Sequence, residues 1–491
     1  MSQSRPAPGE YGLPYPAWRP NQYESIEKIE ASPAPVVFVS APTGTGKSGI
    51  AVALARRAAG ADSRRSTDPG AVIVTSTHQL QEQYVNDFGI PEMRGRANFD
   101  CPLGYEDASV CGLAKSCDAA EGCPYNEAKR AATRAGVFVT NLGYIAALWP
   151  HQPFTHRPLV ILDEGHLAEE GFRSSLAVQF GRKARGILAR TFDAPLPTTE
   201  DLDDWQTYLR TASLLPFREG DADHETLRDN IQKAEGLVFG PEPPVIVVSE
   251  WDADIQPIFG RGAFQKLRDA KTVVMSATLP EPETYARMLG ITDWDLVEVP
   301  PSFPADRHPF YVLPAAKVTK KMEEPDLAQL VAAVDGWLDA WADRKGIIHT
   351  HAYWLQEELL RRTRHRSRLI DHGSRGLAGA VQAFAGAAPG TFLVSPTAHS
   401  GVDLPYDQVR GQLILKLPAP NLGDPVVLAR KAAIPDSYDL QIAQTLQQAH
   451  GRGMRAADDW CDTVMLDDNF RWHFRRNRSL YQDWFAATVV S

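Results

Sequence analysis

The stretch Ala41-Pro-Thr-Gly-Thr-Gly-Lys47-Ser48 decides the fold, because it joins an apolar run to a helical one. The preceding residues, Val36-Val-Phe-Val39, are typical of a buried parallel strand, and Gly49 to Arg56 are typical of a helix. A strand, a glycine-rich turn and a helix N-terminus form a cradle in which backbone N–H groups and the helix dipole face an anion. The stretch therefore predicts a phosphate site in an α/β domain.

The residue types of this stretch favour a nucleoside triphosphate over a merely tight turn. In a P-loop of this kind Lys47 reaches the β- and γ-phosphates, and the Ser48 hydroxyl is a ligand of Mg²⁺. Glycines supply the positive φ that such a turn needs. The sequence thus predicts ATP and Mg²⁺ as cofactors. The remaining candidate nucleotide-binding residues of the loop are Thr43, Gly44, Thr45 and Gly46.

Arg19 and Gln22 precede the P-loop strand, at the start of a helix expected over Tyr23 to Ile29. A glutamine amide can pair with both the amino group and a ring nitrogen of adenine, so the two residues are candidates for base recognition. The same residues also suit an ordinary helix start. The sequence leaves both interpretations open.

A second chemical motif, Asp163-Glu164-Gly-His166, follows the apolar run Leu159 to Leu162. In P-loop ATPases the first carboxylate of such a pair holds Mg²⁺ and the second orients the attacking water. His166 completes the candidate catalytic group. A solvated strand end is the alternative, and the upstream P-loop disfavours it. Ser276-Ala-Thr278 ends another expected strand and offers hydroxyls near these carboxylates, or a helix N-cap.

Composition places the chain among ordinary globular proteins. Its 491 residues are 43% hydrophobic and 23% charged, which suits about three domains. The net charge of −10 argues against a bulk polyanion binder, although a local groove can still be basic. No apolar run approaches the roughly 18 residues of a membrane span, and Met1 to Pro8 lack the apolar core of a secretory signal. We therefore expect a cytoplasmic protein without a membrane partner, associated with the nucleoid if the chain is bacterial or phage-encoded.

Four of the five cysteines lie in one short segment, at Cys101, Cys111, Cys117 and Cys123. In a cytosolic chain such clustering indicates a metal site rather than disulfides. The spacings are nine, five and five residues, without the Cys-x-x-Cys pairs of most structural zinc sites. Four thiolates on a loop also suit a [4Fe–4S] cluster. Spacing alone leaves zinc and iron–sulfur equally open, and Cys461 is expected to be a small core residue.

The rest of the chain alternates between helical and strand patterns. A helical insertion is expected over residues 169–243, with helices over Ser174 to Thr191, Asp201 to Leu215 and His224 to Leu237. Strands are then expected to return at Pro244 to Val248 and at Lys271 to Thr278. An extended linker at Pro300 to Pro304 leads to a second α/β unit, whose sheet Thr463 to Asp468 is expected to close.

A helix expected from Ile442 carries Gln448, Arg452 and Arg455. Arginines three residues apart share one helix face, so both could reach one γ-phosphate and stabilise its transition-state charge. A surface salt bridge is the alternative. The flanking Gly451 and Gly453 favour a close approach to another group.

Taken together, these motifs resemble the superfamily 2 helicases in identity and in order. The order is Ala41 to Ser48, Thr75 to Thr77, Asp163 to His166, Ser276 to Thr278, Ser400 to Asp403 and Gln448 to Arg455. Three further features are similar to the iron–sulfur helicases related to XPD and DinG. These are Gly95 to Cys101 before the first cysteine, Pro301-Ser-Phe303, and Lys416 to Pro425, which resembles their "KLPFPNPxDP" segment.

The resemblance implies an α/β fold of two RecA-like parallel-sheet domains with ATP between them, a small iron–sulfur domain, and a helical Arch-like insertion in the first domain. It adds Asp403 and Gln448 to the nucleotide-binding residues, and it favours iron–sulfur for the four cysteines. The expected boundaries are 1–93, 131–168 and 244–298 for the first RecA-like domain, 94–130 for the cluster domain, 169–243 for the insertion and 299–491 for the second RecA-like domain. The sequence departs from the family at Gly165, usually alanine, and at His399-Ser400, usually Trp-Glu.

The function implied by the resemblance is that of an ATP-dependent DNA helicase with 5′→3′ polarity. It would act on single-stranded and forked DNA, as a monomer open to accessory proteins, and both repair and replication fit. The alternative is an ATP-driven clamp or remodeller within a larger complex, without processive unwinding. Basic and aromatic residues provide candidate nucleic-acid contacts, although a solvated or buried position is the commoner role for each. They are Arg94, Arg96, Lys129, Arg130, Tyr353, Arg361, Arg362, Arg364, Arg366, Arg368, Trp472, Arg475, Arg476 and Arg478.

Overall fold

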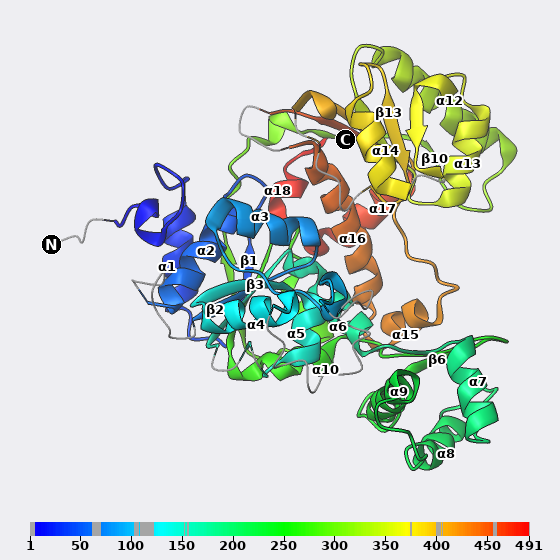
Figure 1. The fold of residues 1–491 in the computed structure, drawn as a ribbon. Helices are drawn as coiled ribbons and strands as arrows, with labels where there is room; N and C mark the ends of the chain where they lie inside the picture. Colours follow the sequence, from blue (N-terminus) through cyan, green and yellow to red (C-terminus); the bar gives the residue numbers. More distant parts are fainter. Residues whose placement is uncertain are drawn as a thin grey trace.

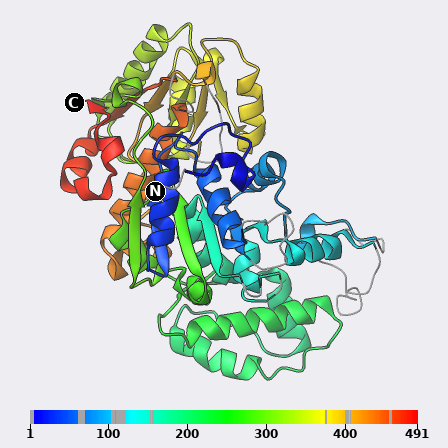
Figure 2. The ribbon, with the colours of Figure 1, turned by 90° about the vertical axis from the view of Figure 1, so that its left-hand side faces the viewer.

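The protein consists of two parallel-sheet domains and a smaller antiparallel insertion. The structure is a computed structural model that describes residues 5–60, 70–102, 108, 122–151, 153–154, 157–373, 376–398, 404, 406–454 and 459–490. The second domain and the insertion lie at opposite ends of the molecule, with the first domain between them (Figures 1 and 2). The expected α/β fold with two RecA-like sheets is confirmed.

The first domain is built on a six-stranded parallel sheet in the order β3-β2-β4-β8-β1-β9. The strands are β1 (Val36–Ser40), β2 (Ala71–Thr75), β3 (Val137–Asn141), β4 (Leu159–Asp163), β8 (Lys271–Ser276) and β9 (Trp294–Glu298). Because the strands are parallel, their carboxyl ends meet at one edge, where the P-loop, the Asp163 motif and the Ser276 motif come together. No strand was expected at β9.

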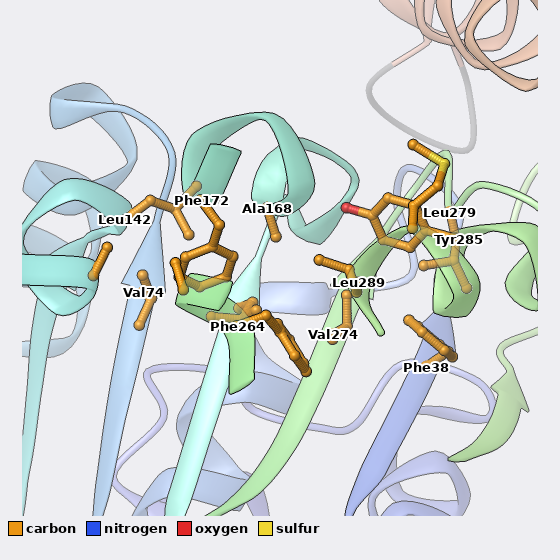
Figure 3. Packing of buried hydrophobic residues seen from close by; sticks show 14 of the residues in the cluster. Phe38, Val74, Leu142, Ala168, Phe172, Phe264, Val274, Leu279, Tyr285 and Leu289 are labelled. Carbon is orange, nitrogen blue, oxygen red and sulfur yellow. The ribbon is translucent and has the colours of Figure 1, made fainter. Parts of the chain in front are cut away.

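Both faces of this sheet are covered, as parallel sheets require. Alternate residues of each strand point to opposite faces, so Val37 and Val39 join one buried cluster and Val36 and Phe38 the other. One face packs against α1 (Gln22–Ala31), α2 (Lys47–Ala58) and α3 (His78–Phe88). The other packs against α4 (Pro124–Arg134), α5 (Leu142–Leu148), α6 (Ala168–Leu176), α10 (Arg261–Phe264) and α11 (Pro282–Leu289). Figure 3 shows Phe172, Phe264 and Tyr285 within this second cluster.

The second domain has a seven-stranded parallel sheet in the order β12-β13-β11-β14-β15-β10-β16. The strands are β10 (Phe310–Ala316), β11 (Gly346–His349), β12 (Leu369–Asp371), β13 (Phe392–Ser395), β14 (Gly411–Ile414), β15 (Asp462–Asp467) and β16 (Val489–Val490). The strand at β15 was expected to close the sheet, which is wrong, because β10 and β16 lie beyond it. β10 is the first strand of the domain along the chain and β15 is one of the last. The residues around β10 therefore do not indicate that it pairs with β15.

Helices on both faces complete the second domain. α12 (Glu324–Ala340) and α13 (Tyr353–Arg362) pack on one face, and α14 (Gly376–Ala385) and α16 (Asp436–His450) pack on the other. α16 lies between the two domains (Figure 1). Its residues Leu440, Ile442 and Leu446 belong to the same buried cluster as Phe38 of the first domain. One apolar core therefore continues from the first sheet through α16 to the second.

The insertion differs from the helical segment expected over residues 169–243. It contains α7 (Arg182–Thr191), α8 (Leu202–Ala212) and α9 (Ala222–Val238), but also an antiparallel sheet of β5 (Val178–Phe180), β7 (Ala253–Gln256) and β6 (Val245–Val248). The helix expected over Ser174 to Thr191 is interrupted by β5. The strand at Val245 was assigned to the first RecA-like domain and pairs instead with β7. Strands of three or four residues are too short for an alternating pattern to identify them or their partners.

The insertion therefore begins and ends later in the chain than residues 169–243. α6 was expected within it, yet Phe172 of α6 is buried in the core of the first domain. The separate core of the insertion begins at Val178 and ends at Ile255. In the described part of the chain, no helix has the length and apolar character that crossing a membrane requires.

Candidate nucleotide site between the domains

The P-loop joins β1 to α2 as its sequence predicts. Gly44 and Gly46 have φ values of 85° and 84°, which glycine adopts without strain, and α2 begins directly at Lys47. The Thr45 side chain is buried and donates to the Pro42 carbonyl at 2.8 Å, which stabilises the turn from within. Gly44 has a second constraint, because a Cβ at this position would meet the ring of Phe303 at 2.0 Å. The first turn of α2 thus presents its N–H groups beneath the loop.

The two carboxylates lie directly opposite the P-loop, where β4 ends. Glu164 has a φ of 51°, an unusual value for a residue with a side chain. Its carboxylate is held from both sides: Lys47 Nζ lies 3.0 Å from Oε1, and His166 Nδ1 lies 3.2 Å from Oε2. His166 Nδ1 also lies 2.7 Å from the Ser276 hydroxyl, which accepts the Thr278 N–H at 3.1 Å. These contacts join the P-loop, Asp163 and Ser276 motifs into one network.

The electrostatic environment sets the two carboxylates apart. Burial and the neighbouring Glu164 charge raise the pKa of Asp163, although Lys47 and the hydrogen bond from Tyr84 partly oppose this. Burial alone would also raise the pKa of Glu164. The Lys47 charge and the bond to His166 outweigh that effect and hold the Glu164 pKa well below its usual range. Glu164 is therefore an ionised acceptor at neutral pH, as a residue that orients water must be.

A cavity of about 340 Å³ lies between the two domains and collects most of the predicted nucleotide residues. From the first domain it is lined by Arg19, Thr43, Gly44, Gly46, Lys47, Ser48, Asp163, Glu164 and His166, and from the second by Gln448 and Arg452. Gln448 is buried, and within the described part of the chain its Nε2 has no hydrogen-bond partner. A buried amide donor facing a cavity in this way suits an acceptor on a ligand. Asp403 and Arg455 lie outside the described residues.

The arginines are arranged differently from the expectation. α16 ends at His450, and Arg452 lies on the following 3-10 turn, Gly451–Gly453, rather than on the helix that was expected to carry it. The reason lies in the glycines: they are poor helix formers, and a Cβ at Gly453 would meet Cys461 Sγ at 2.2 Å. The tight turn places Arg452 in the lining of the cavity.

The donor set of the cavity suits Mg²⁺. The Ser48 hydroxyl and the Asp163 carboxylate are hard oxygen ligands, which Mg²⁺ prefers. Among the described residues, the Glu164 N–H donates to Asp163 Oδ1 and the Tyr84 hydroxyl donates to Oδ2. A carboxylate oxygen has capacity for a further partner.

Sequence comparisons identify the family to which the chain belongs. The DEAD/DEAH box helicase family matches residues 19–195, and the helicase C-terminal domain matches residues 341–488, so that together they span more than half of the chain. The chain is a superfamily 2 helicase. It therefore uses ATP and Mg²⁺ and acts on nucleic acid.

Solved structures with the same fold include XPD helicases. A structure titled XPD helicase superposes with a TM-score of 0.61 at 14% identity, covering 94% of this helicase and 97% of that chain. Xpd4 from S. tokodaii superposes with a TM-score of 0.59 at 13% identity, covering 96% and 100%. No curated protein matched the helicase by sequence. The shared architecture is thus XPD-like, at low sequence identity.

Arg19 and Gln22 contact the P-loop of the helicase directly. Gln22 is almost fully buried; its Oε1 accepts the Arg19 N–H at 3.0 Å and its Nε2 donates to the Gly46 carbonyl at 3.0 Å. The Arg19 guanidinium donates to the Gly44 carbonyl. Both side chains therefore hold the loop in place, and only Arg19 also lines the cavity.

Substitution of Gln22 distinguishes support of the P-loop from recognition of adenine. Gln22→Ala removes one bond to the loop, so we expect the affinity for ATP to fall by about tenfold, the effect of one lost hydrogen bond and a loosened turn. If Gln22 only supports the loop, affinities for ATP and GTP fall equally in a fluorescent-nucleotide titration. If it reads adenine, the preference for ATP over GTP falls as well. Unchanged affinity for both nucleotides would contradict either role.

Only two of the four clustered cysteines lie within the described residues. Cys101 is partly buried, and Cys123 is buried directly before α4, in the same cluster as Tyr125. Cys111 and Cys117 lie outside the described residues. Among the residues that are described, no group of three or more His, Cys, Asp or Glu side chains could hold a metal ion.

Several residues of the helicase site were missed by sequence reasoning. Tyr84 of α3 donates to Asp163 Oδ2, Gln444 of α16 donates to the His166 carbonyl at 3.2 Å, and Tyr15 lines the cavity. Tyr84 and Gln444 occupy ordinary positions of amphipathic helices, so their sequence pattern indicates only packing or exposure. Tyr15 sits in a proline-rich segment without a motif. Only their proximity in the fold reveals them.

Proposed function

We propose that this helicase translocates 5′→3′ on single-stranded DNA and separates the strands of a forked duplex, using ATP hydrolysed between its two RecA-like domains. The observation that carries the proposal is the shared cavity, in which Lys47 and Glu164 of one domain face Gln448 and Arg452 of the other. A site divided between two domains responds to ATP by closing and to hydrolysis by opening. Such cycles are what stepwise movement along a strand requires.

Each residue of the site has a proposed role. Lys47 binds the β- and γ-phosphates, with the P-loop amides from Thr43 to Ser48 around them. Glu164 orients and deprotonates the attacking water, and His166 links it to the Ser276 motif. Mg²⁺, held by Ser48 and Asp163, would neutralise phosphate charge. Arg452, with Arg455, stabilises the charge that develops on the γ-phosphate, and Gln448 and Asp403 complete the nucleotide contacts.

Lys47 has two competing partners in this scheme. It lies 3.0 Å from Glu164 Oε1, and the same ammonium group would bind the phosphates of ATP. When Lys47 turns toward the phosphates, Glu164 keeps its second contact, His166, at 3.2 Å. The carboxylate thereby becomes available to water at the moment the phosphate is bound, so nucleotide binding itself would prepare the site.

A second cavity supports a nucleic-acid path across the first domain. It lies at the carboxyl ends of β2 and β3 and is lined by Ser76, Thr77, His78, Asn98, Asn141 and Tyr144, among others. Thr77 and Asn141 cap α3 and α5, so two helix N-termini open onto this cavity. Helix N-termini and short polar side chains suit a phosphate backbone and carry little base specificity.

The arginines of the basic run in the second domain have partners within the protein, so we expect fewer of them to contact nucleic acid than the sequence suggests. Arg362 pairs with Glu324 and Glu358, Arg364 with Asp339 and Arg366 with Asp371. Arg368 donates to three backbone carbonyls. These arginines mainly support the domain. We retain Trp472, Arg475 and Arg476, which are exposed on α17 (Asn469–Arg476), as candidate nucleic-acid contacts.

For the cysteine segment we propose a [4Fe–4S] cluster held by Cys101, Cys111, Cys117 and Cys123, in a small domain over residues 94–130. The four thiols in one segment and the XPD-like fold support this assignment. The burial of Cys123 against the first domain would anchor the cluster beside the nucleic-acid path. The cluster domain would then act as the wedge at the fork.

Unwinding of tailed duplexes tests the whole proposal. We expect displacement of 5′-tailed DNA but not of 3′-tailed DNA, ATP turnover that rises with single-stranded DNA, and bound iron and sulfide in an anaerobic preparation. Lys47→Ala should abolish displacement, whereas Lys183→Ala, an exposed lysine of the insertion, should not. Stimulated ATP turnover without displacement would establish the clamp or remodeller instead. Equimolar zinc in a colourless preparation would overturn the cluster, and displacement of RNA duplexes alone would overturn the DNA substrate.

A further inference from the structure

Tyr84 is buried beneath the nucleotide cavity and contacts the residues that the proposed function assigns to Mg²⁺. Its side chain is 1% exposed, and its hydroxyl donates to Asp163 Oδ2 at 2.7 Å. The Ser48 side chain also interacts with the Tyr84 phenol, whose pKa it lowers. One phenol on α3 thus joins two residues that come from the P-loop helix and from the end of β4.

We propose that Tyr84 is a positioning residue that orients the Ser48 hydroxyl and the Asp163 carboxylate for Mg²⁺. This inference rests on the proposed function, because the ion is that of MgATP. Tyr84 itself touches neither nucleotide nor ion in this arrangement and acts through the two oxygen ligands.

The hydrogen bonds of Asp163 explain how the orientation is set. Oδ1 accepts the backbone N–H of Glu164 at 2.9 Å, and Oδ2 accepts the Tyr84 hydroxyl. Donors on both oxygens resist rotation of the carboxylate about its bond to Cβ, since any rotation breaks a bond in a buried place. Each oxygen retains a lone pair for a further partner.

The chemistry of a phenol suits this place. A tyrosine hydroxyl is ordinarily uncharged at neutral pH, so it donates to Asp163 Oδ2 without adding a charge beside the ion. A lysine or arginine would also bond the carboxylate, but its positive charge would repel Mg²⁺. A phenylalanine would fill the same space among Phe88 and its apolar neighbours. Packing therefore does not require the hydroxyl, and burying a hydroxyl without a hydrogen bond costs free energy. We conclude that the tyrosine is present for its hydrogen bond to Asp163.

Nucleotide binding with and without Mg²⁺ tests the proposal. Tyr84→Phe is titrated with a fluorescent, non-hydrolysable ATP analogue in excess Mg²⁺ and again in EDTA, with no nucleic acid present. We expect the gain in affinity that Mg²⁺ confers to fall by roughly tenfold, the effect of losing one hydrogen bond to a charged group, with affinity in EDTA unchanged. Electron paramagnetic resonance of Mn²⁺ in the same complexes should show correspondingly weaker ion binding.

Two controls separate this role from a structural one. Tyr481→Phe removes another buried phenol, whose oxygen lies 2.8 Å from His473 Nδ1 in the second domain, and it should leave the Mg²⁺ gain intact. The gain is the ratio of two affinities measured on the same preparation. An unfolded fraction of the protein affects both affinities equally, so it does not change the ratio. A Tyr84→Phe variant that keeps the full gain, or loses affinity equally in Mg²⁺ and EDTA, overturns the proposal.

Failure of the proposed function gives a different pattern. Asp163→Asn is expected to remove the Mg²⁺ gain whatever Tyr84 does. If the unsubstituted helicase shows no gain, or Asp163→Asn retains it, the Mg²⁺ assignment itself is wrong. If Asp163→Asn loses the gain and Tyr84→Phe keeps it, only the role of Tyr84 is wrong.

Discussion

Glu164→Gln is expected to reduce ATP turnover by at least about 100- to 1000-fold, the usual effect of removing a group that acts at the transition state. Glutamine has the shape of glutamate but can neither carry the charge nor accept the proton of the attacking water. Glu164 is prepared for both, because Lys47 and His166 lie on its two oxygens and hold its pKa low. The P-loop is unaltered, so ATP affinity should remain within a few-fold of the original.

The measurement is steady-state ATP turnover at saturating single-stranded DNA, together with nucleotide affinity. Glu283→Gln, an exposed carboxylate on α11 of the same domain, is the matched control and should retain full turnover. Turnover near the original rate in Glu164→Gln would exclude this residue from the hydrolysis step. Loss of ATP affinity with unchanged maximal turnover would instead assign Glu164 to binding.

Arg430→Ala is expected to lower the free energy of unfolding by about 3–5 kcal/mol, because it leaves a buried charge without its partner. Arg430 lies on α15 (Pro425–Ala433) of the second domain, and Glu169 lies on α6 of the first. Their pairing is bidentate, at 2.9 and 2.7 Å, and the Glu169 side chain is only 4% exposed. Arg430 also donates to the Ile258 carbonyl at 2.9 Å, next to the end of the insertion.

A double-mutant cycle in urea measures the interaction. Glu169→Leu combined with Arg430→Leu should recover most of the loss, since an apolar pair no longer buries an unpaired charge. Arg364→Ala is the control: its pair with Asp339 is exposed and should be worth no more than about 1 kcal/mol. A cost for Arg430→Ala no greater than that of the control would show that the two domains do not depend on this contact.

Much of the nucleotide site could be predicted because it is encoded locally. Lys47 and Ser48 lie in one strand–turn–helix unit, and Asp163 and Glu164 follow directly on a strand, so short stretches determine both their structure and their chemistry. The alternation of apolar strands with helices was likewise sufficient for two parallel sheets. The order of the motifs along the chain then indicated that the two sheets share one ATP.

Contacts between distant segments could not be predicted. Tyr84 and Asp163 are 79 residues apart, Glu169 and Arg430 are 261 apart, and His166 and Gln444 are 278 apart. The local sequence around each of these residues predicts no special role. Its partner is determined only by how the helices and strands pack in the folded protein. The sheet of the insertion escaped prediction for a related reason. Its strands have three or four residues each, and β5 is separated from β7 by three helices.

The ring of Phe303 against Gly44 has a mechanical consequence. The chain leaves the first domain after β9 and enters the second at β10, so Phe303 belongs to the connection between them. If the second domain rotates about this connection, the pivot lies beside the P-loop, and β12 lies at the edge of the second sheet away from β10, the strand that the connection enters. A small rotation at this connection would therefore move that edge of the second domain further than it moves the P-loop.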